Sequence, residues 1–281
     1  MMSVEQILTG FVYLAVVLVL LVIGKWVFDL LHRRFVLRTE LIERDNLAVA
    51  TAVAGYYLGV VIVLTGVVSG PASFSLLDDV IGLAVYGLLG IVLLNLSAWL
   101  NDKVIFRQFV IEREIVEDRN VGVGVIEGGN YVAMGLVTAG AMSGEGGLAS
   151  GLAFWIGGLV ALLVAGLLYD RITSYDLHDQ IERGNVAVAI AFAGVLVGFG
   201  NIIRLAGEGD FVSWNASLTE FGYYTVVGLV LLPLVRLFAD KVLLPGASLS
   251  DELLQDSPNL GAGIIEASTY LAASMLIGLT L

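Results

Sequence analysis

The sequence predicts an all-α, polytopic membrane protein with eight transmembrane helices. Of its 281 residues, 58% are hydrophobic and 14% are charged, whereas soluble domains are about 45–50% apolar and about 25% charged. Eight apolar runs each reach the length of about 20 residues that a helix needs to cross a hydrocarbon layer of about 30 Å. The two halves of the chain also repeat the same motifs. These observations predict two parallel four-helix repeats, related by a pseudo-two-fold axis along the membrane normal.

The composition excludes several classes of protein. A net charge of −12 has the wrong sign for binding phosphate, so no nucleic acid is expected as a partner. The absence of cysteine excludes a disulfide scaffold and thiolate metal ligands. The two histidines lack metal-ligand spacing, and no nucleophile–base arrangement or phosphate loop is visible. We therefore expect no metal, no cofactor and no enzymatic activity. The excess of acids is also typical of the exposed surfaces of halophile proteins.

The predicted crossings follow the apolar runs in order. They are residues 7–31, 46–68, 77–100, 120–142, 149–171, 185–206, 217–239 and 260–281. The first run is too long for a signal peptide and no basic segment precedes it, so we expect it to remain in the mature protein. Longer, charged linkers follow the first, third, fifth and seventh crossings, and short loops rich in Gly and Ser join the others.

The distribution of basic residues predicts the orientation in the membrane. The four linkers carry most of them: Arg33, Arg34, Arg38, Arg44, Lys103, Arg107, Arg113, Arg119, Arg183 and Lys241. The short loops carry acids, and only Arg204 flanks them. Because Lys and Arg are enriched on the cytoplasmic side, we expect a multi-pass protein of the plasma membrane with cytoplasmic linkers and with both termini outside.

Two motifs recur at one offset and divide the chain into two units. Residues 43–50 (E-R-x-N-x-A-x-A) recur as residues 182–189, and residues 120–127 (N-x-G-x-G-x-x-E) recur as residues 259–266, in both cases 139 residues later. We therefore predict a first repeat over residues 1–145 and a second over residues 146–281. Each repeat holds an even number of crossings, so the two repeats enter the membrane in the same orientation.

These two motifs, within halves of four predicted helices each, resemble the membrane protein family known as domain of unknown function 350, here in two tandem copies. The resemblance covers nearly the whole chain. It implies a membrane fold in which two copies form the working unit, but it supplies no substrate, cofactor or catalytic residue.

The candidate ion or proton site lies on the helices that begin with the second motif. Glu127 and Glu266 each stand seven residues after the motif asparagine, about 10 Å along a helix, and Tyr131 and Tyr270 continue the same face. Asn130 lies three residues after Glu127. An ionisable group at this depth is expensive and often functional. The alternative is that each glutamate makes a structural contact with a neighbouring helix.

Two further sets of polar residues recur at helix ends. The asparagines Asn46, Asn120, Asn185 and Asn259 stand where a linker becomes an apolar helix, which predicts N-caps. The aspartates Asp29, Asp102, Asp170 and Asp240 end the other helices. They could pair with nearby cations, and the spacing of Arg236 four residues before Asp240 predicts such a pair. They could instead form a cytoplasmic acidic ring at a cation vestibule.

Two functions fit these features. The first is a channel or carrier for a small cation or a proton, in which Glu127 and Glu266 face each other near the two-fold axis. The second is a non-transporting scaffold or sensor that couples the lipid bilayer to a cytoplasmic protein partner through the linkers. The sequence does not predict an oligomeric state.

Overall fold

Long helices joined in hairpins make up most of the part of the chain that the computed structural model describes, residues 4–70, 75–105, 110–144, 146–209, 211–244 and 246–280. They are α1 (Val4–Leu31), α2 (Leu47–Val68), α3 (Leu76–Ile105), α5 (Val121–Ser143), α6 (Gly147–Ile172), α8 (Val186–Gly207), α9 (Trp214–Phe238) and α11 (Leu260–Thr280). The linkers hold the π-helices η1 (Thr39–Glu43) and η2 (Ala239–Leu243) and the short helices α4 (Ile111–Val116), α7 (Leu177–Glu182) and α10 (Leu249–Leu253). No strand occurs in these ranges, so the all-α prediction is confirmed.

Seven of the long helices are long and apolar enough to cross a membrane. They coincide with seven of the eight predicted runs. The remaining run, 217–239, falls on α9, a 25-residue helix that contains Pro233 and is not among the seven. The chain is therefore a multi-pass membrane protein, and α9 as an eighth crossing stays a prediction.

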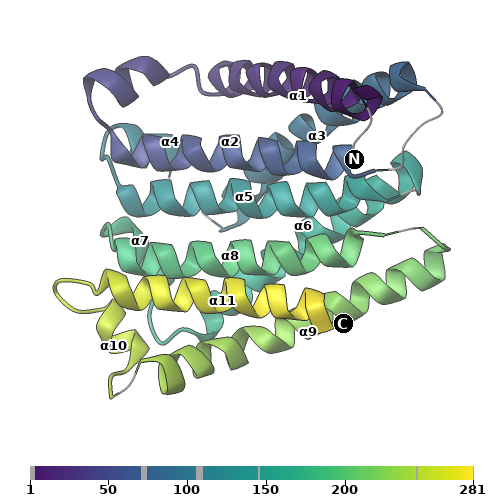
Figure 1. Cartoon of the computed structure of the whole chain (residues 1–281). Helices are drawn as coiled ribbons and strands as arrows, with labels where there is room; N and C mark the ends of the chain where they lie inside the picture. The colour runs from purple at the N-terminus through teal and green to yellow at the C-terminus, as the bar shows by residue number, and fades with distance from the viewer. Residues whose placement is uncertain are drawn as a thin grey trace.

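The helices that follow the motif asparagines form one row. α2, α5, α8 and α11 lie side by side in this order, and each packs extensively on the next (Figure 1). All four begin at the end where the linkers lie and end at the opposite side, so they are parallel (Figure 1). This row holds the largest part of the buried core.

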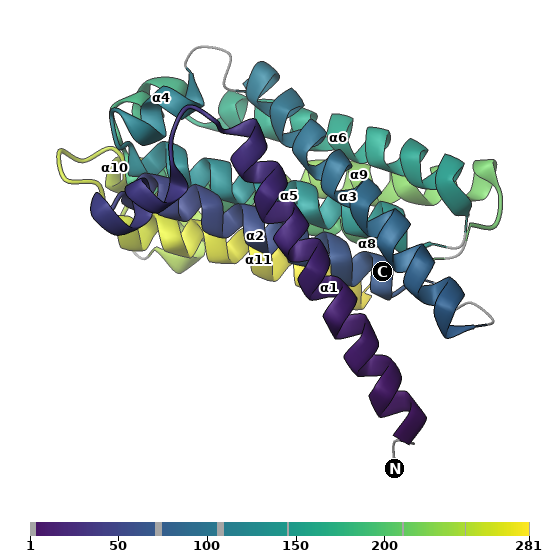
Figure 2. The same ribbon diagram turned by 90° about the horizontal axis from the view of Figure 1, so that it is seen from above.

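A second layer covers one side of the row (Figure 2). α3 contacts α2 and α5, α6 contacts α5 and α8, and α9 contacts α8 and α11. Each of these helices therefore lies over the joint between two helices of the row. α1 contacts α2 and α3 and crosses them obliquely (Figure 2).

The order of the row contradicts the predicted two-fold axis. Such an axis exchanges α2 with α8 and α5 with α11, so α11 would have to contact α2 as α5 contacts α8. Instead, α2 and α11 lie at opposite ends of the row (Figure 1). The predicted rotation is therefore wrong. The hairpins follow one another by a repeated shift, because an offset in sequence fixes which residues correspond but not how the units are placed.

Small residues allow the helices of the row to approach closely. A Cβ atom added to Gly55 would lie 2.2 Å from the Cα of Gly128, and one added to Gly129 would lie 2.7 Å from the Cβ of Ala193. Either distance is too short for a side chain, so the backbones themselves are in contact. In lipid this close fit is a main source of helix association.

Candidate functional site

The two motif glutamates lie in separate buried clusters. Glu127 on α5 is 4% exposed and Glu266 on α11 is fully buried. α8 lies between these two helices (Figure 1). The structure therefore does not bring the glutamates together. The expected common site near a two-fold axis is wrong, because the linear order of the row keeps α5 and α11 apart.

Glu127 has a second carboxyl group as its neighbour. Asp102, in the last turn of α3, lies beside it, and Tyr131 lies one turn further along α5. Oδ1 of Asp102 and Oε2 of Glu127 are buried, and no hydrogen-bond donor of the described residues reaches them. We call Asp102 and Glu127 the carboxyl pair.

An amide pair lies next to the carboxyl pair on the same two helices. Asn101 Nδ2 donates to Asn130 Oδ1 at 2.6 Å, and both residues are fully buried. The remaining atoms of this pair, Asn101 Oδ1 and Asn130 Nδ2, have no partner among the described residues. The buried hydroxyl of Thr138, further along α5, is also unpaired there, and the methyl group of this residue lies near Gly90 of α3. We call this line of polar groups between α3 and α5 the polar seam.

A cavity lies at the other end of the polar seam. Its volume is about 340 Å³, and its walls come from α1, α2, α3, α5, α6 and the ends of neighbouring loops. On α5 it reaches Ala141 and Met142, one turn beyond Thr138. Its polar lining includes Tyr13, whose hydroxyl donates to Asp79 at 2.7 Å. Polar groups therefore lie at both ends of the contact between α3 and α5.

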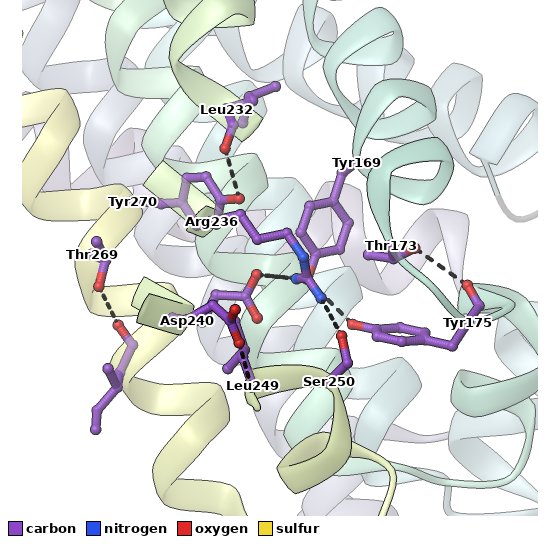
Figure 3. Close-up of polar contacts among 12 residues, drawn as sticks. Tyr169, Thr173, Tyr175, Leu232, Arg236, Asp240, Leu249, Ser250, Thr269 and Tyr270 are labelled. Atoms are coloured by element: carbon purple, nitrogen blue, oxygen red, sulfur yellow. Dashed lines mark hydrogen bonds and ion pairs between the residues drawn. The ribbon is translucent and has the colours of Figure 1, made fainter. Parts of the chain in front are cut away.

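Glu266, in contrast, is neutralised by a buried cation, Arg236, whose surroundings are drawn in Figure 3. Arg236 of α9 donates from Nη1 to Glu266 Oε1 and to the hydroxyl of Tyr169, the latter at 3.1 Å. Its Nη2 donates to Ser250 at 3.2 Å, and its guanidinium lies 5.4 Å from the ring centre of Tyr169 and 5.8 Å from that of Tyr175. We call this group the Arg236 cluster.

The hydroxyl of Tyr169 completes the Arg236 cluster by donating to Glu266 Oε1 at 3.1 Å. Tyr175 follows α6, and its burial raises the pKa of its hydroxyl, which therefore stays protonated. These contacts join α6, α9, α10 and α11. The glutamate of the second repeat thus holds helices together, which is the structural alternative that the sequence left open.

The difference between the two repeats comes from a single cation. The residue 139 positions before Arg236 is Ser97, which accepts a hydrogen bond from Trp155 Nε1 at 2.8 Å. The first repeat therefore has no arginine at this place, and Glu127 has the acid Asp102 as its neighbour instead.

Sequence reasoning missed both partners of the glutamates. Arg236 could have been found, because it is a cation inside an apolar run at a depth similar to that of Glu266. Its predicted pairing with Asp240 is wrong. Asp240 instead accepts from Lys241 and, at 2.7 Å, from the backbone of Leu249, and these contacts lower the pKa of its carboxyl group.

The remaining candidate residues have other neighbours. Tyr270 donates to the carbonyl of Leu232 at 3.1 Å and so ties α11 to α9. Asp29 pairs with Lys25 on its own helix at 2.5 Å. The four aspartates of the expected acidic ring lie on α1, α3, α6 and η2, which follow one another along the molecule, and Asp102 among them faces Glu127. The structure does not gather them into one ring.

The four motif asparagines cap the helices of the row. Each side-chain oxygen accepts from a backbone N–H in the first turn, at 3.1–3.3 Å for Asn46, Asn120, Asn185 and Asn259. Each amide nitrogen also donates to a side chain of the short helix before it: Glu40, Glu114, Gln180 and Glu252, respectively. Before Asn185, Gly184 has φ +77°, a conformation that favours glycine.

Three of these asparagines also bind the linker of the next hairpin. Asn46 donates to the carbonyl of Ile115 at 2.9 Å, Asn120 to that of Ile181 at 2.9 Å, and Asn185 to that of Leu253 at 2.8 Å. We call this contact the linker clamp. It fixes each short helix against the N-terminus of a neighbouring long helix.

Within the described ranges, no group of three His, Asp or Glu side chains could hold a metal ion. The carboxyl pair offers groups that can bind a proton or a cation. In a site with low dielectric constant, two carboxylates cannot both carry a charge without compensation, so the pair must hold a proton or a cation.

Comparisons with known proteins agree with a membrane protein made of two units. The family model described as Domain of Unknown Function (DUF350) matches residues 1–142 and again residues 145–281. A protein of Aquifex aeolicus (strain VF5), named UPF0719 transmembrane protein, is 24% identical over 261 residues, which are 91% of this chain and 94% of that protein.

A relative from Bacillus subtilis (strain 168), named UPF0719 transmembrane protein YshE, is 26% identical over 109 residues. These are 39% of this chain and 77% of the relative, which is therefore about half as long. No solved structure matches the chain. Since the family model covers both halves, the chain belongs to the DUF350 family and is an integral membrane protein.

Proposed function

We propose that this protein carries protons, or a small cation in their place, through the membrane, and that the carboxyl pair of Asp102 and Glu127 is its binding site. The observation that carries the proposal is two neighbouring carboxyl groups, each of which keeps one buried oxygen, Asp102 Oδ1 and Glu127 Oε2, without a hydrogen-bond partner among the described residues. The proposed site differs from the one expected from the sequence, because the partner of Glu127 is Asp102 and not Glu266.

Electrostatics supports an exchangeable proton or cation at this pair. Two unit charges about 4 Å apart repel by about 4 kcal/mol at an effective dielectric constant of about 20, in addition to the cost of burying each charge. One shared proton removes the repulsion and supplies the missing donor. A protein that needed only a structural contact here could use an arginine, as it does for Glu266.

The polar seam supports a path on both sides of the pair. The pair lies about 10 Å along α5 from the linker end, and the cavity of about 340 Å³ lies at the opposite end. Apolar side chains, such as the buried Met134, lie between Tyr131 and Thr138. This arrangement favours a carrier with alternating access over a wide aqueous pore.

The proposal includes the orientation expected from the linkers. We place the protein in the plasma membrane with eight crossings, α9 included, with cytoplasmic linkers and with both termini outside. The linker end then faces the cytoplasm and the cavity faces the exterior.

The test is proton flux into liposomes that contain the purified protein. Under an imposed potential, wild-type protein should acidify the lumen, and Glu127→Gln and Asp102→Asn should each abolish the flux. Arg236→Met/Glu266→Gln is the matched control, because it changes the same motif position in the second repeat without leaving a buried charge unpaired, and it should keep the flux. Replacing the proton gradient by a sodium or potassium gradient identifies a cation in place of the proton.

Absence of flux in the wild-type protein across pH and potential would reject transport. The same holds if Glu127→Gln transports as well as the wild type. The second candidate, a scaffold that binds a cytoplasmic protein partner, would then be favoured by the linker clamps. They hold the short helices α4, α7 and α10 as a fixed surface at one end of the molecule.

A further inference from the structure

The two outer helices of the row, α2 and α11, each have an uncovered face. These two faces correspond in sequence to the two faces that meet in the contact between α8 and α5. The internal joint between α5 and α8 places Gly129 against Ala193 and Ala133 against Gly200. At one end of the row, α11 exposes Ser268 and Ala272, which lie 139 residues after Gly129 and Ala133. These two positions are therefore exposed at the end of the row although their counterparts are buried in its middle.

The opposite end of the row shows the complementary half. α2 exposes Ala54 and Val61, which lie 139 residues before Ala193 and Gly200. Burial of whole helices follows the same pattern. The apolar span of α5 and of α8 is 78% buried, whereas that of α11 is 39% and that of α2 is 56% buried.

The linker clamp is also incomplete at both ends. Asn259, the fourth capping asparagine, donates to Glu252, but within the described residues its amide has no carbonyl of a following linker to bind. At the other end, Leu41 follows Glu40 in η1, as Ile115 follows Glu114 in α4. No asparagine of a preceding hairpin binds Leu41 in the described residues.

In the second layer, α1 packs on fewer helices of the row than its counterparts do. α3, α6 and α9 each lie over a joint between two helices of the row, whereas the main contact of α1 with that row, over the described residues, is with α2. The apolar span of α1 is 11% buried, compared with 39% for α3 and 44% for α6. One more helix beside α2 would give α1 the second neighbour that its counterparts have.

From these observations we propose that α11 of one copy packs beside α2 and α1 of a second copy and so repeats the joint between α5 and α8. In this contact Asn259 of one copy donates to the carbonyl of Leu41 of the second copy. The four helices of the row are parallel (Figure 1), so both copies have the same orientation in the membrane.

The contact is heterologous, because it joins two different faces. It leaves a free end on each side and therefore continues until a ring closes. Val61 stands where the internal joint has Gly200, so the helices of two copies lie further apart than α5 and α8.

Disulfide crosslinking in liposomes tests the contact directly, because the chain has no cysteine. The variant Ala54→Cys/Ser268→Cys places one thiol at each end of the row. The two thiols cannot meet within one copy, so every disulfide joins two copies. We expect a ladder of covalent multimers under mild oxidation.

The matched control is Ala54→Cys/Leu271→Cys. Leu271 lies on the same helix at a similar depth, but its counterpart Val132 on α5 stays partly exposed although α5 lies inside the row. The control should remain mostly monomeric. Equal crosslinking of both variants would indicate random collisions and would overturn the proposal, as would the absence of crosslinking in both.

A second variant tests the contact without cysteine. Ser268 is exposed within one copy, so Ser268→Trp should fold normally but block the close approach of a second copy. The mass of the protein in lipid nanodiscs should fall from a multiple of 29.8 kDa to one copy, whereas Leu271→Trp should leave it unchanged. A wild-type protein with the mass of one copy, or a Ser268→Trp variant that keeps the multiple, would contradict the proposal.

Discussion

Replacing Arg236 by Met should destabilise the protein in a pH-dependent way. Arg236→Met keeps a side chain of similar length but removes the only charge that neutralises Glu266 among its described contacts. The carboxyl group of Glu266 is fully buried, and its Oε2 already lacks a partner. In the variant it must therefore remain as an uncompensated charge or take up a proton.

The cost of proton uptake sets the magnitude. The ordinary pKa of a glutamate carboxyl group is about 4.3. Keeping the group protonated above this pH costs the folded state about 1.4 kcal/mol for each pH unit. The cost is about 4 kcal/mol at pH 7 and about 1 kcal/mol at pH 5. The value at pH 7 lies within the range of about 3–5 kcal/mol for removing one partner of a buried ion pair.

The sign follows from proton counting. At pH 7 the folded variant holds a proton that the unfolded variant has lost, so its stability decreases as the pH rises. In the wild-type protein Arg236 neutralises Glu266, so this dependence should be weaker. Unfolding by sodium dodecyl sulfate in mixed micelles, measured at pH 5, 6 and 7, gives the difference in free energy of unfolding.

The double variant Arg236→Met/Glu266→Gln is the control, because it removes both charges together. It should recover most of the lost stability at pH 7 and should unfold independently of pH in this range. A loss below about 1 kcal/mol at pH 7 would refute the reasoning, since breaking a buried pair costs about 3–5 kcal/mol. A loss that does not change with pH would refute it as well.

Two further predictions concern the ends of the molecule. Val36→Cys and Val212→Cys introduce single thiols at exposed valines, one between α1 and η1 and the other between α8 and α9. An impermeant reagent applied to cells should label only the second, and the reverse pattern would overturn the orientation. His32 is buried and stacks on Phe28 at 4.1 Å, and this burial lowers the pKa of its imidazole. As the pH falls below about 6.5, the unfolded chain therefore takes up the proton before the folded protein does. The stability of the folded protein should decrease over this range. The stability of His32→Gln should lack this decrease, and a wild-type imidazole whose NMR titration midpoint is 6.5 or higher would contradict it.

The helices could be predicted from the sequence because lipid imposes a simple requirement. Every crossing needs about 20 apolar residues in a helix, and the predicted run 46–68 differs from α2 by one residue at its start. Capping by the motif asparagines was predictable for a similar reason, since Asn46 stands at a boundary where the first N–H groups need acceptors.

The arrangement of the helices could not be predicted in the same way. The offset of 139 residues indicates that Glu127 and Glu266 correspond, but a rotation and a shift produce the same offset. The partners of the two glutamates come from α3 and α9, and their choice depends on packing between helices that are distant in sequence. For this reason the pairing of Asp102 with Glu127 and that of Arg236 with Glu266 were found only in the structure.

The parallel row has an electrical consequence. Each of its four helices begins at the linker end, and the backbone dipole of a helix is equivalent to about half a positive charge at its N-terminus. Antiparallel neighbours would cancel these partial charges, whereas parallel neighbours add them along the row. The carboxylates of Glu40, Glu114 and Glu252, which bind the capping asparagines, lie against this positive edge. They act as its counterions, which explains why acids gather on the side of the molecule that also holds most of its lysines and arginines.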